Sequence, residues 1–125
     1  MFDLLGGDKE NKVQLVKNGE GLADYLAFNA QDRNKYLEIK TTKGINRAPA
    51  YAYLLDVISD GERGTEISLL FSFMMIEIRG KNLQELAHAL AMRGCSFIQE
   101  FSPKAFSQPE PSATIIESIE IVAKK

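Results

Sequence analysis

His88 and Glu85 are the first side chains whose types and spacing could perform chemistry. A carboxylate one helical turn before an imidazole can orient the ring and raise its pKa, an arrangement suited to general acid–base catalysis. His88 is the only histidine among the 125 residues, so sites that need several imidazoles are excluded. On an amphipathic helix both side chains are also expected on the solvent side. An exposed, non-catalytic pair is therefore the favoured interpretation.

Cys95 is the only cysteine. It cannot close a disulfide within the chain, and it excludes zinc sites built on two or more thiolates. Its place at the start of an apolar segment predicts a small buried hydrophobic side chain rather than a nucleophile. The absence of cysteine pairs favours a reducing, cytoplasmic location.

Carboxylates cluster around a glycine-containing loop, at Asp60, Glu62 and Glu66. Oxygen ligands on a flexible loop are typical of calcium sites. The spacing departs from the EF-hand pattern, because positions five and six of such a loop would be Gly64 and Thr65. A solvated hairpin loop is the expected structure, and neither a metal nor a cofactor is predicted.

Asp56 and Glu77 each interrupt an apolar strand-like segment. A carboxylate that faces a partly buried pocket can acquire a raised pKa suited to proton transfer. Alternation places both side chains on a solvent face equally well. Whether they line a pocket together with His88 is left open by the sequence.

Residues 33–47 carry five basic side chains against the single acidic Glu38. Basic residues interleaved with an aromatic ring can follow a phosphate backbone and stack a base. The glycine-rich stretch of a P-loop does not precede Lys40. The candidate anion-binding or nucleic-acid-binding residues are Arg33, Lys35, Tyr36, Lys40, Lys43 and Arg47.

Two short segments, Val13–Gly19 and Ile78–Asn82, together with Phe28 and Asn34, resemble the signature segments of Sm-like RNA-binding barrels. The chain departs from that family because no helix precedes the first segment, the stretch between the segments is long, and Ile78–Asn82 leads into a predicted helix. We do not assign the chain to the family. For an RNA-binding function, the resemblance implies a ring of subunits whose loops present Asn34 and Arg79 to RNA.

Composition indicates one ordinary globular domain. Hydrophobic residues make up 45% and charged residues 26% of the chain, and the formal net charge is -2, so no overall field points to nucleic acid or anionic lipid. No apolar run has the length of a membrane span, and the first residues lack the pattern of a signal peptide. We expect a loose segment at 1–12 followed by a single domain at 13–125, with no membrane partner.

Alternating apolar residues predict most of the strands. We expect strands at 13–16, 36–40, 51–58, 66–78, 95–101 and 114–122, with a loop at 41–50. Residues 22–28 fit a helix or a strand, and a strand is favoured because turn-like residues follow. A change of parity near Met74 and Met75 indicates a bulge or bend within a long strand.

A single helix is predicted at 82–93. Asn82 can cap its start while Glu85 completes a capping box, and Gly94 can adopt the left-handed conformation at its end. Leu83, Leu86, Ala87 and Leu90 form its apolar stripe.

These elements predict an α+β fold, with a mostly antiparallel, curved sheet of about six strands, or a partly closed barrel, and one helix covering one face. The core is expected to contain a set of large apolar side chains from both: Leu55, Val57, Leu69, Phe71, Phe73, Leu83, Leu86, Leu90, Phe97 and Ile119.

An apolar surplus lies on the opposite parity, where no second helix is predicted to cover it. It comprises Leu70, Met74, Ile76 and Ile98. Barrel closure or a symmetric partner could cover it. The sequence therefore favours a non-enzymatic protein-interaction or assembly module that forms a homo-oligomer through its sheet. The alternative is an RNA-binding or polyanion-binding domain that uses residues 33–47.

Overall fold

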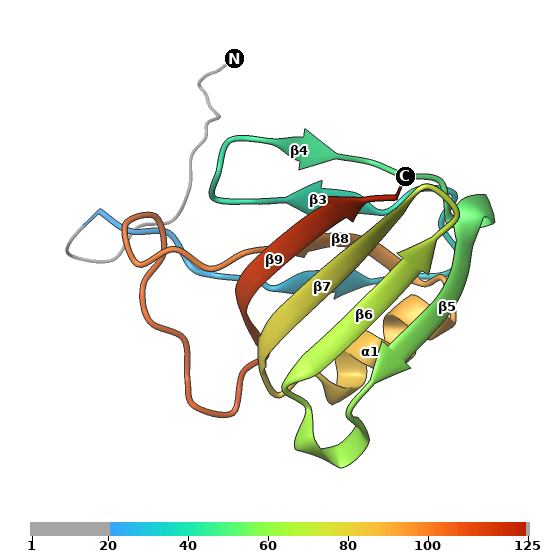
Figure 1. Ribbon diagram of the computed structural model, residues 1–125. Helices are drawn as coiled ribbons and strands as arrows, with labels where there is room; N and C mark the ends of the chain where they lie inside the picture. Colours follow the sequence, from blue (N-terminus) through green and yellow to red (C-terminus); the bar gives the residue numbers. More distant parts are fainter. Residues whose placement is uncertain (1–20, 125) are drawn as a thin grey trace. The chain divides into compact units, whose positions relative to one another are not determined.

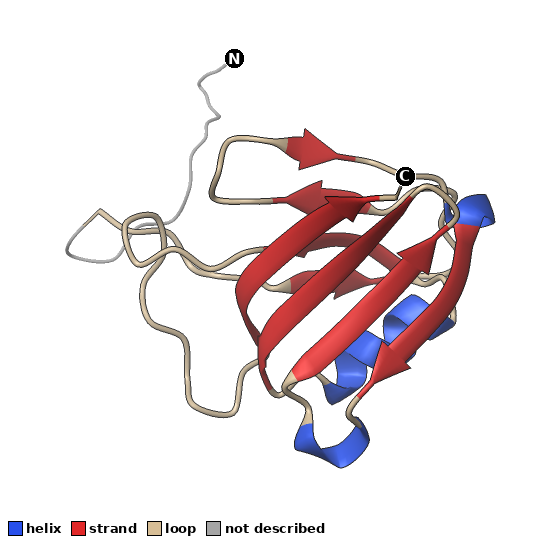
Figure 2. Ribbon diagram, viewed as in Figure 1, coloured by secondary structure: helices blue, strands red, loops and turns tan. Residues whose placement is uncertain are grey.

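The computed structural model describes residues 21–124, which group into two compact units. The larger unit contains residues 26–102 and 109–124, and the smaller contains residues 21–25 and 103–108. The strand expected at 13–16 and the segment 1–12 lie outside the described residues. The larger unit is an α+β fold, as expected, with two sheets and one α-helix (Figures 1 and 2).

One sheet, here called the long sheet, has the strand order β5-β6-β7-β9 and is antiparallel throughout. Its strands are β5 (Leu54–Ser59), β6 (Glu66–Phe71), β7 (Met74–Lys81) and β9 (Ile115–Ala123). The predicted long strand at 66–78 is wrong, because Ser72 and Phe73 form a turn between β6 and β7. This turn explains why the apolar positions of the sequence change parity near Met74.

The other sheet, here called the short sheet, has the order β2-β8-β3-β4. Its strands are β2 (Phe28–Ala30), β8 (Cys95–Gln99), β3 (Glu38–Lys40) and β4 (Asn46–Arg47). The β3–β8 pair is parallel and the other pairs are antiparallel. Residues 41–50, expected to be only loop, thus contribute a strand, whereas residues 22–28 contain only the first residue of one.

The α-helix, α1, spans Gln84–Ala91 and is shorter than predicted. Asn82 does not cap it: its φ is 56°, and its side-chain amide donates hydrogen bonds to the Pro111 and Ala113 carbonyl oxygens, each at 2.9 Å. The left-handed residue after the helix is Arg93, with φ 57°, rather than Gly94. Among the described residues no helix has both the length and the apolar character needed to cross a bilayer.

The chain also contains two short 3-10 helices. The first, η1 (Tyr51–Tyr53), precedes β5, and the second, η2 (Gly61–Arg63), connects β5 to β6. The expected strand at 51–58 therefore begins late. A bulge between Leu54 and Asp56 changes the parity of this strand. Leu54 is buried and Leu55 is 65% exposed, so the assignment of Leu55 to the core is wrong.

The two sheets are joined on one side by the chain that leaves β8. The Glu100 N–H donates to the Lys40 carbonyl oxygen at 2.9 Å, and the Phe101 N–H donates to the Ile116 carbonyl oxygen of β9 at 2.8 Å. On the other side, α1 lies between the edge strands β5 and β2 and contacts both (Figure 1). The described strands do not form a closed barrel, and the helix occupies the opening between the sheets.

The core lies between the sheets and the helix. It includes Leu69, Phe71, Leu83, Leu86, Leu90 and Ile119, as predicted. Val57 and Phe97 are only half-buried, and Phe73 is 39% exposed because it belongs to a turn.

Met74, Ile76 and Ile98 are completely buried within this unit. Their expected role as an exposed self-association surface is therefore wrong. The long and short sheets are two layers that cover each other, whereas the sequence predicted one sheet with an uncovered face.

The smaller unit is held by backbone pairing between its two segments. Ala23 forms a parallel bridge with Phe106. The Ala23 N–H donates to Ala105 at 3.1 Å, and the Ser107 N–H donates to Ala23 at 2.9 Å. The Tyr25 and Phe106 rings pack edge to face with centroids 5.2 Å apart.

Candidate functional site

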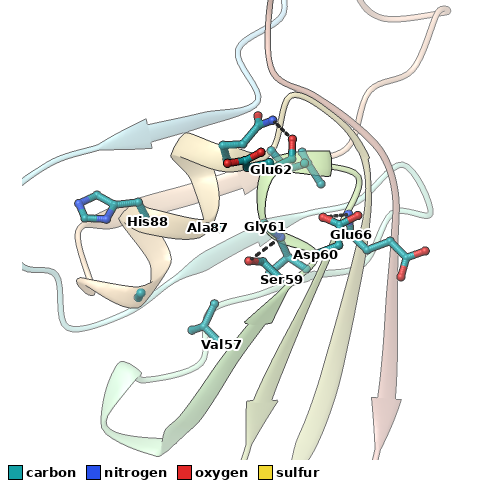
Figure 3. A pocket seen from close by; sticks show the side chains of 13 residues that line it. Val57, Ser59, Asp60, Gly61, Glu62, Glu66, Ala87 and His88 are labelled. Carbon is teal, nitrogen blue, oxygen red and sulfur yellow. Dashed lines mark hydrogen bonds between the residues drawn. The ribbon is translucent and has the colours of Figure 1, made fainter.

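Two cavities flank helix α1 in the larger unit. The first, of about 450 Å³, lies between α1, the end of β5 and the η2 loop (Figure 3). The second, of about 550 Å³, lies between α1 and the end of β2. His88 lines both cavities. This helix, placed between two strand edges, therefore creates the two concave surfaces described here.

The floor of the first cavity is apolar. Ile67 and Leu83 are fully buried beneath it, and Val57 contributes a half-buried side chain from β5. Ala87 and Ala91 lie four residues apart on α1, so they share one face of the helix. Their small side chains leave space between the helix and β5 where larger ones would fill it.

Asp60 organises the loop that closes one end of this cavity. Its carboxylate accepts hydrogen bonds from the Thr65 N–H at 3.0 Å and the Glu66 N–H at 3.3 Å, and a further one from the Thr65 hydroxyl. The Thr65 hydroxyl is the main cause that holds the pKa of Asp60 below its ordinary value, with the backbone N–H groups adding to it. This carboxylate is thus an ionised structural acceptor at neutral pH.

The same loop is attached to the start of α1. The Leu83 N–H donates to the Gly64 carbonyl oxygen at 2.9 Å, and the Gln84 side-chain amide donates to the Glu62 carbonyl oxygen at 2.9 Å (Figure 3). Gly64 adopts φ 62°, and a Cβ atom there would lie 2.5 Å from the Gln84 side-chain amide, which would have to move away. The loop and the helix therefore present a defined end to the cavity.

The lining of the first cavity carries negative charge. Asp60, Glu62 and Glu66 line it, and its lining residues include no lysine or arginine. Glu66 lies 3.8 Å from the Arg79 guanidinium on the neighbouring strand. No group of three potential metal ligands converges anywhere in residues 21–124, so these carboxylates are spread along the cavity rather than gathered around a cation.

His88 and Glu85 are both exposed, as the sequence favoured. Within the described part of the chain, the His88 imidazole forms no hydrogen bond or ion pair with Glu85, and the His88 backbone carbonyl oxygen accepts a hydrogen bond from the Met92 N–H at 3.0 Å. Asp56 and Glu77 lie on the face of the long sheet that points away from the core and line neither cavity. The structure does not bring these side chains together as an acid–base constellation.

Cys95 is fully buried, and burial raises the pKa of its thiol to about 12. Its carbonyl oxygen accepts a 2.6 Å hydrogen bond from the Tyr51 hydroxyl, and burial raises the pKa of that phenol as well. The thiol therefore stays protonated at neutral pH. This environment is that of a structural cysteine.

The six candidate anion-binding residues do not form one free basic surface. Lys40 lies over the Phe97 ring at 4.4 Å, and Arg47 lies 6.0 Å from the Phe73 ring centroid. Lys43 forms a 3.1 Å ion pair with Glu120 of β9. The remaining three are exposed and close in sequence: Arg33, Lys35 and Tyr36.

Arg79 and Asn34, which the Sm-like resemblance assigned to RNA contact, have partners within the chain. Arg79 lies 3.7 Å from Glu77 as well as 3.8 Å from Glu66. The Asn34 amide donates to the Asp32 carbonyl oxygen at 3.0 Å. The positive charge of Arg79 is thus balanced by two neighbouring carboxylates.

An apolar surface, of which the sequence predicted only Leu70, lies at one end of the long sheet. Leu70, Met75 and Val122 are registered with one another across β6, β7 and β9, on the face away from the core. Large exposed side chains at this end of the sheet are Val122 itself, Leu55 in β5, Tyr53 in η1 and Phe73 in the β6–β7 turn. The sequence did contain a signal, because the outward-facing residues of each of these strands are polar at one end and apolar at the other. Only the strand register shows that the apolar ends lie side by side.

Comparisons with protein-family models, with curated proteins and with solved structures give no match.

Proposed function

We propose that the protein is a non-enzymatic interaction module that self-associates through the outer face of the long sheet. The observation that carries this proposal is the apolar end, defined as Tyr53, Leu55, Leu70, Phe73, Met75 and Val122. Leu55, Leu70, Met75 and Val122 belong to strands of the long sheet, whereas Tyr53 and Phe73 lie in η1 and in the β6–β7 turn at the same end, with their ring centroids 6.0 Å apart.

Strand register explains why the apolar end is continuous. The Leu70, Met75 and Val122 row crosses β6, β7 and β9, and the exposed Asp56 of β5 is aligned with Leu70 at its edge. In the next row Ser68, Glu77 and Glu120 are aligned on β6, β7 and β9, with the exposed Ile58 beside Ser68 on β5. Contiguous exposed apolar patches are uncommon on monomeric proteins and mark interaction surfaces.

Face-to-face packing of two sheets suits this arrangement. A two-fold axis would place one apolar end against the same surface of a second copy. The charged rows, which include the Lys43–Glu120 ion pair, would remain at the solvated rim, as in other interfaces. A second copy is therefore the occupant that we assign to the apolar end.

The test is the molar mass in solution, measured by size-exclusion chromatography with light scattering at micromolar concentration. We expect a dimer for the natural chain and a monomer for Leu55→Lys and Val122→Lys. Ile45→Lys is the matched control, because Ile45 is 64% exposed but lies in the β3–β4 connection, and it should remain dimeric. A natural chain that is monomeric throughout would contradict the proposal.

A second candidate function is polyanion binding through Arg33, Lys35 and Tyr36, favoured by their exposure within one short segment. It predicts salt-sensitive binding of single-stranded RNA. Fluorescence anisotropy should show that the Arg33→Glu/Lys35→Glu variant loses binding while Lys124→Glu retains it. Absence of binding by the natural chain at low salt would remove this candidate.

A further inference from the structure

We infer that the first cavity and the adjoining edge of β5 form a groove for an extended peptide that carries basic side chains. The peptide would add to the long sheet as a strand beside β5. This inference concerns the β5 edge of the sheet, whereas the proposed function concerns the outer face; the two surfaces meet at Asp56, which is aligned with Leu70.

The edge of β5 is available for pairing. β5 is the outermost strand of the long sheet and pairs on one side with β6 (Figure 1). On the other side, α1 contacts β5, and the Arg93 guanidinium donates to the Leu54 carbonyl oxygen at 3.0 Å. Beyond Leu54, the outward-facing backbone groups of β5 have no strand partner among residues 21–124. Unpaired edge groups of this kind are the template for strand addition.

The floor beside this edge suits an added strand. Neighbouring strands lie about 4.8 Å apart, and alternate side chains point to opposite faces. The inward side chains of an added strand would lie against Val57, Ala87 and Ala91, which line the cavity. The alanines on α1 leave room for side chains of valine size.

The negative charge along the β5 edge favours a peptide with basic side chains. Asp56 is exposed on the outer face of β5, and Asp60 and Glu62 lie at the end of the cavity. In the described residues Asp56 and Glu62 form no ion pair with a lysine or arginine. Since the carboxylates are spread along the edge and do not converge as metal ligands, they complement a row of basic side chains.

A second copy of β5 does not fit this description. The β5 sequence, LLDVIS, contains Asp56 and no basic residue. Pairing two copies along this edge would bring carboxylates together without a compensating cation, and like charges across strands are unfavourable. In a partner with alternating basic and valine-like side chains, the basic ones would face the carboxylates and the valine-like ones would pack on the apolar floor of the cavity.

The test uses a fluorescein-labelled, C-terminally amidated peptide of sequence KVKVKV, with affinity measured by anisotropy. We expect saturable binding to the natural chain and at least a tenfold loss for Asp56→Lys and for Ala87→Phe, which fills the floor. Glu110→Lys is the matched charge control, because Glu110 is exposed and lies outside the groove, and it should bind normally. Unchanged melting midpoints would show that the variants fold.

Two peptide controls separate strand addition from simple charge attraction. Peptide N-methylated at alternate residues on its β5-facing edge should lose binding, because it cannot donate the backbone hydrogen bonds. Equal binding of the methylated peptide, or of EVEVEV, would overturn the inference. Val122→Lys, which disrupts the proposed dimer, should bind KVKVKV normally, so failure of self-association and failure of peptide binding are distinguishable.

Discussion

The two sheets of the larger unit are built on different principles. The long sheet consists of strands of 6 to 9 residues that are antiparallel throughout, with one register shift in β5 and one in β7, and apolar alternation determines which face is buried. The short sheet consists of strands of 2 to 5 residues in mixed orientation.

Side-chain hydrogen bonds compensate for the short strands. Glu100 is 6% exposed, and its carboxylate accepts from the Thr42 N–H at 2.8 Å and hydroxyl at 3.0 Å and from the Ile119 N–H at 3.0 Å. It thereby connects the β3–β4 hairpin with β9 of the long sheet. One sheet is thus specified by its alternating pattern, and the other depends on individual polar contacts.

The largest expected effect tests the packing of the long sheet. In Gly80→Ala the new Cβ would lie 1.9 Å from the Ile115 carbonyl oxygen on the paired strand β9. Because backbone on a paired strand cannot move aside cheaply, we expect a loss of about 3 kcal/mol or more in unfolding free energy, measured by urea denaturation.

Gly44→Ala is the matched substitution near the short sheet. Gly44 has φ +82°, and an alanine Cβ at this position would have no atom within 4 Å, so only backbone conformation opposes alanine. We expect a loss of about 1 kcal/mol. Equal losses of unfolding free energy for Gly80→Ala and Gly44→Ala would contradict the expected difference between tight backbone packing in the long sheet and open space near the short sheet.

An intermediate effect tests the polar connection at Glu100. Glu100→Ala removes the acceptor for three donors, and we expect a loss of about 2 kcal/mol, since buried donors left without partners are costly. Glu100→Gln retains one side-chain oxygen and should lose about half as much. Urea denaturation measures both, and a Glu100→Ala variant as stable as the natural chain would show that the carboxylate is dispensable.

The smallest effect concerns the Asp60 loop and depends on pH. The pKa of Asp60 is lower in the folded chain than the ordinary value of 3.8, chiefly because of the Thr65 hydroxyl. The folded state therefore holds this proton less tightly than the unfolded state, so the stabilisation is complete above pH 3.8 and is lost as the pH falls through the lower folded value.

Melting midpoints measured between pH 6 and pH 2 check this expectation. Asp60→Ala should lower the midpoint at pH 6 and have less effect at the acidic end. Asp32→Asn removes another exposed carboxylate and controls for the general change in charge. A difference between Asp60→Ala and the natural chain that stays constant over the whole range would refute the linkage.

The sequence predicted the long sheet better than the short one. Alternation in Ile67, Leu69 and Phe71 identified β6 and its buried face, and the apolar stripe identified α1. Alternation could not reveal the turn at Ser72 and Phe73, because the apolar pattern continues through it with changed parity. Strands as short as Asn46–Arg47 carry too few side chains for any period to be detected.

The candidate site was predictable only in part. The acidic loop and His88 were visible as residues, but their separation across a cavity depends on where α1 lies relative to β5. Met74 and Ile76 of the long sheet and Ile98 of the short sheet were assigned to a surface because the sequence did not show that the strands form two layers that cover each other. The continuity of the apolar end depends on register across three strands, which no single segment encodes.

The placement of β8 also has a kinetic consequence. β5, β6 and β7 pair with sequence neighbours, whereas β8 pairs with β2 and β3, and the Asn29–Ser96 and Thr42–Glu100 contacts join residues 67 and 58 positions apart. Long loops must close before such contacts form, so we expect the β5–β7 meander to acquire amide protection earlier than Ile39 and Ile98 in pulse-labelled refolding. Simultaneous protection would contradict this order. In the expected order, the molecule gains its short sheet as the last and slowest step of becoming native.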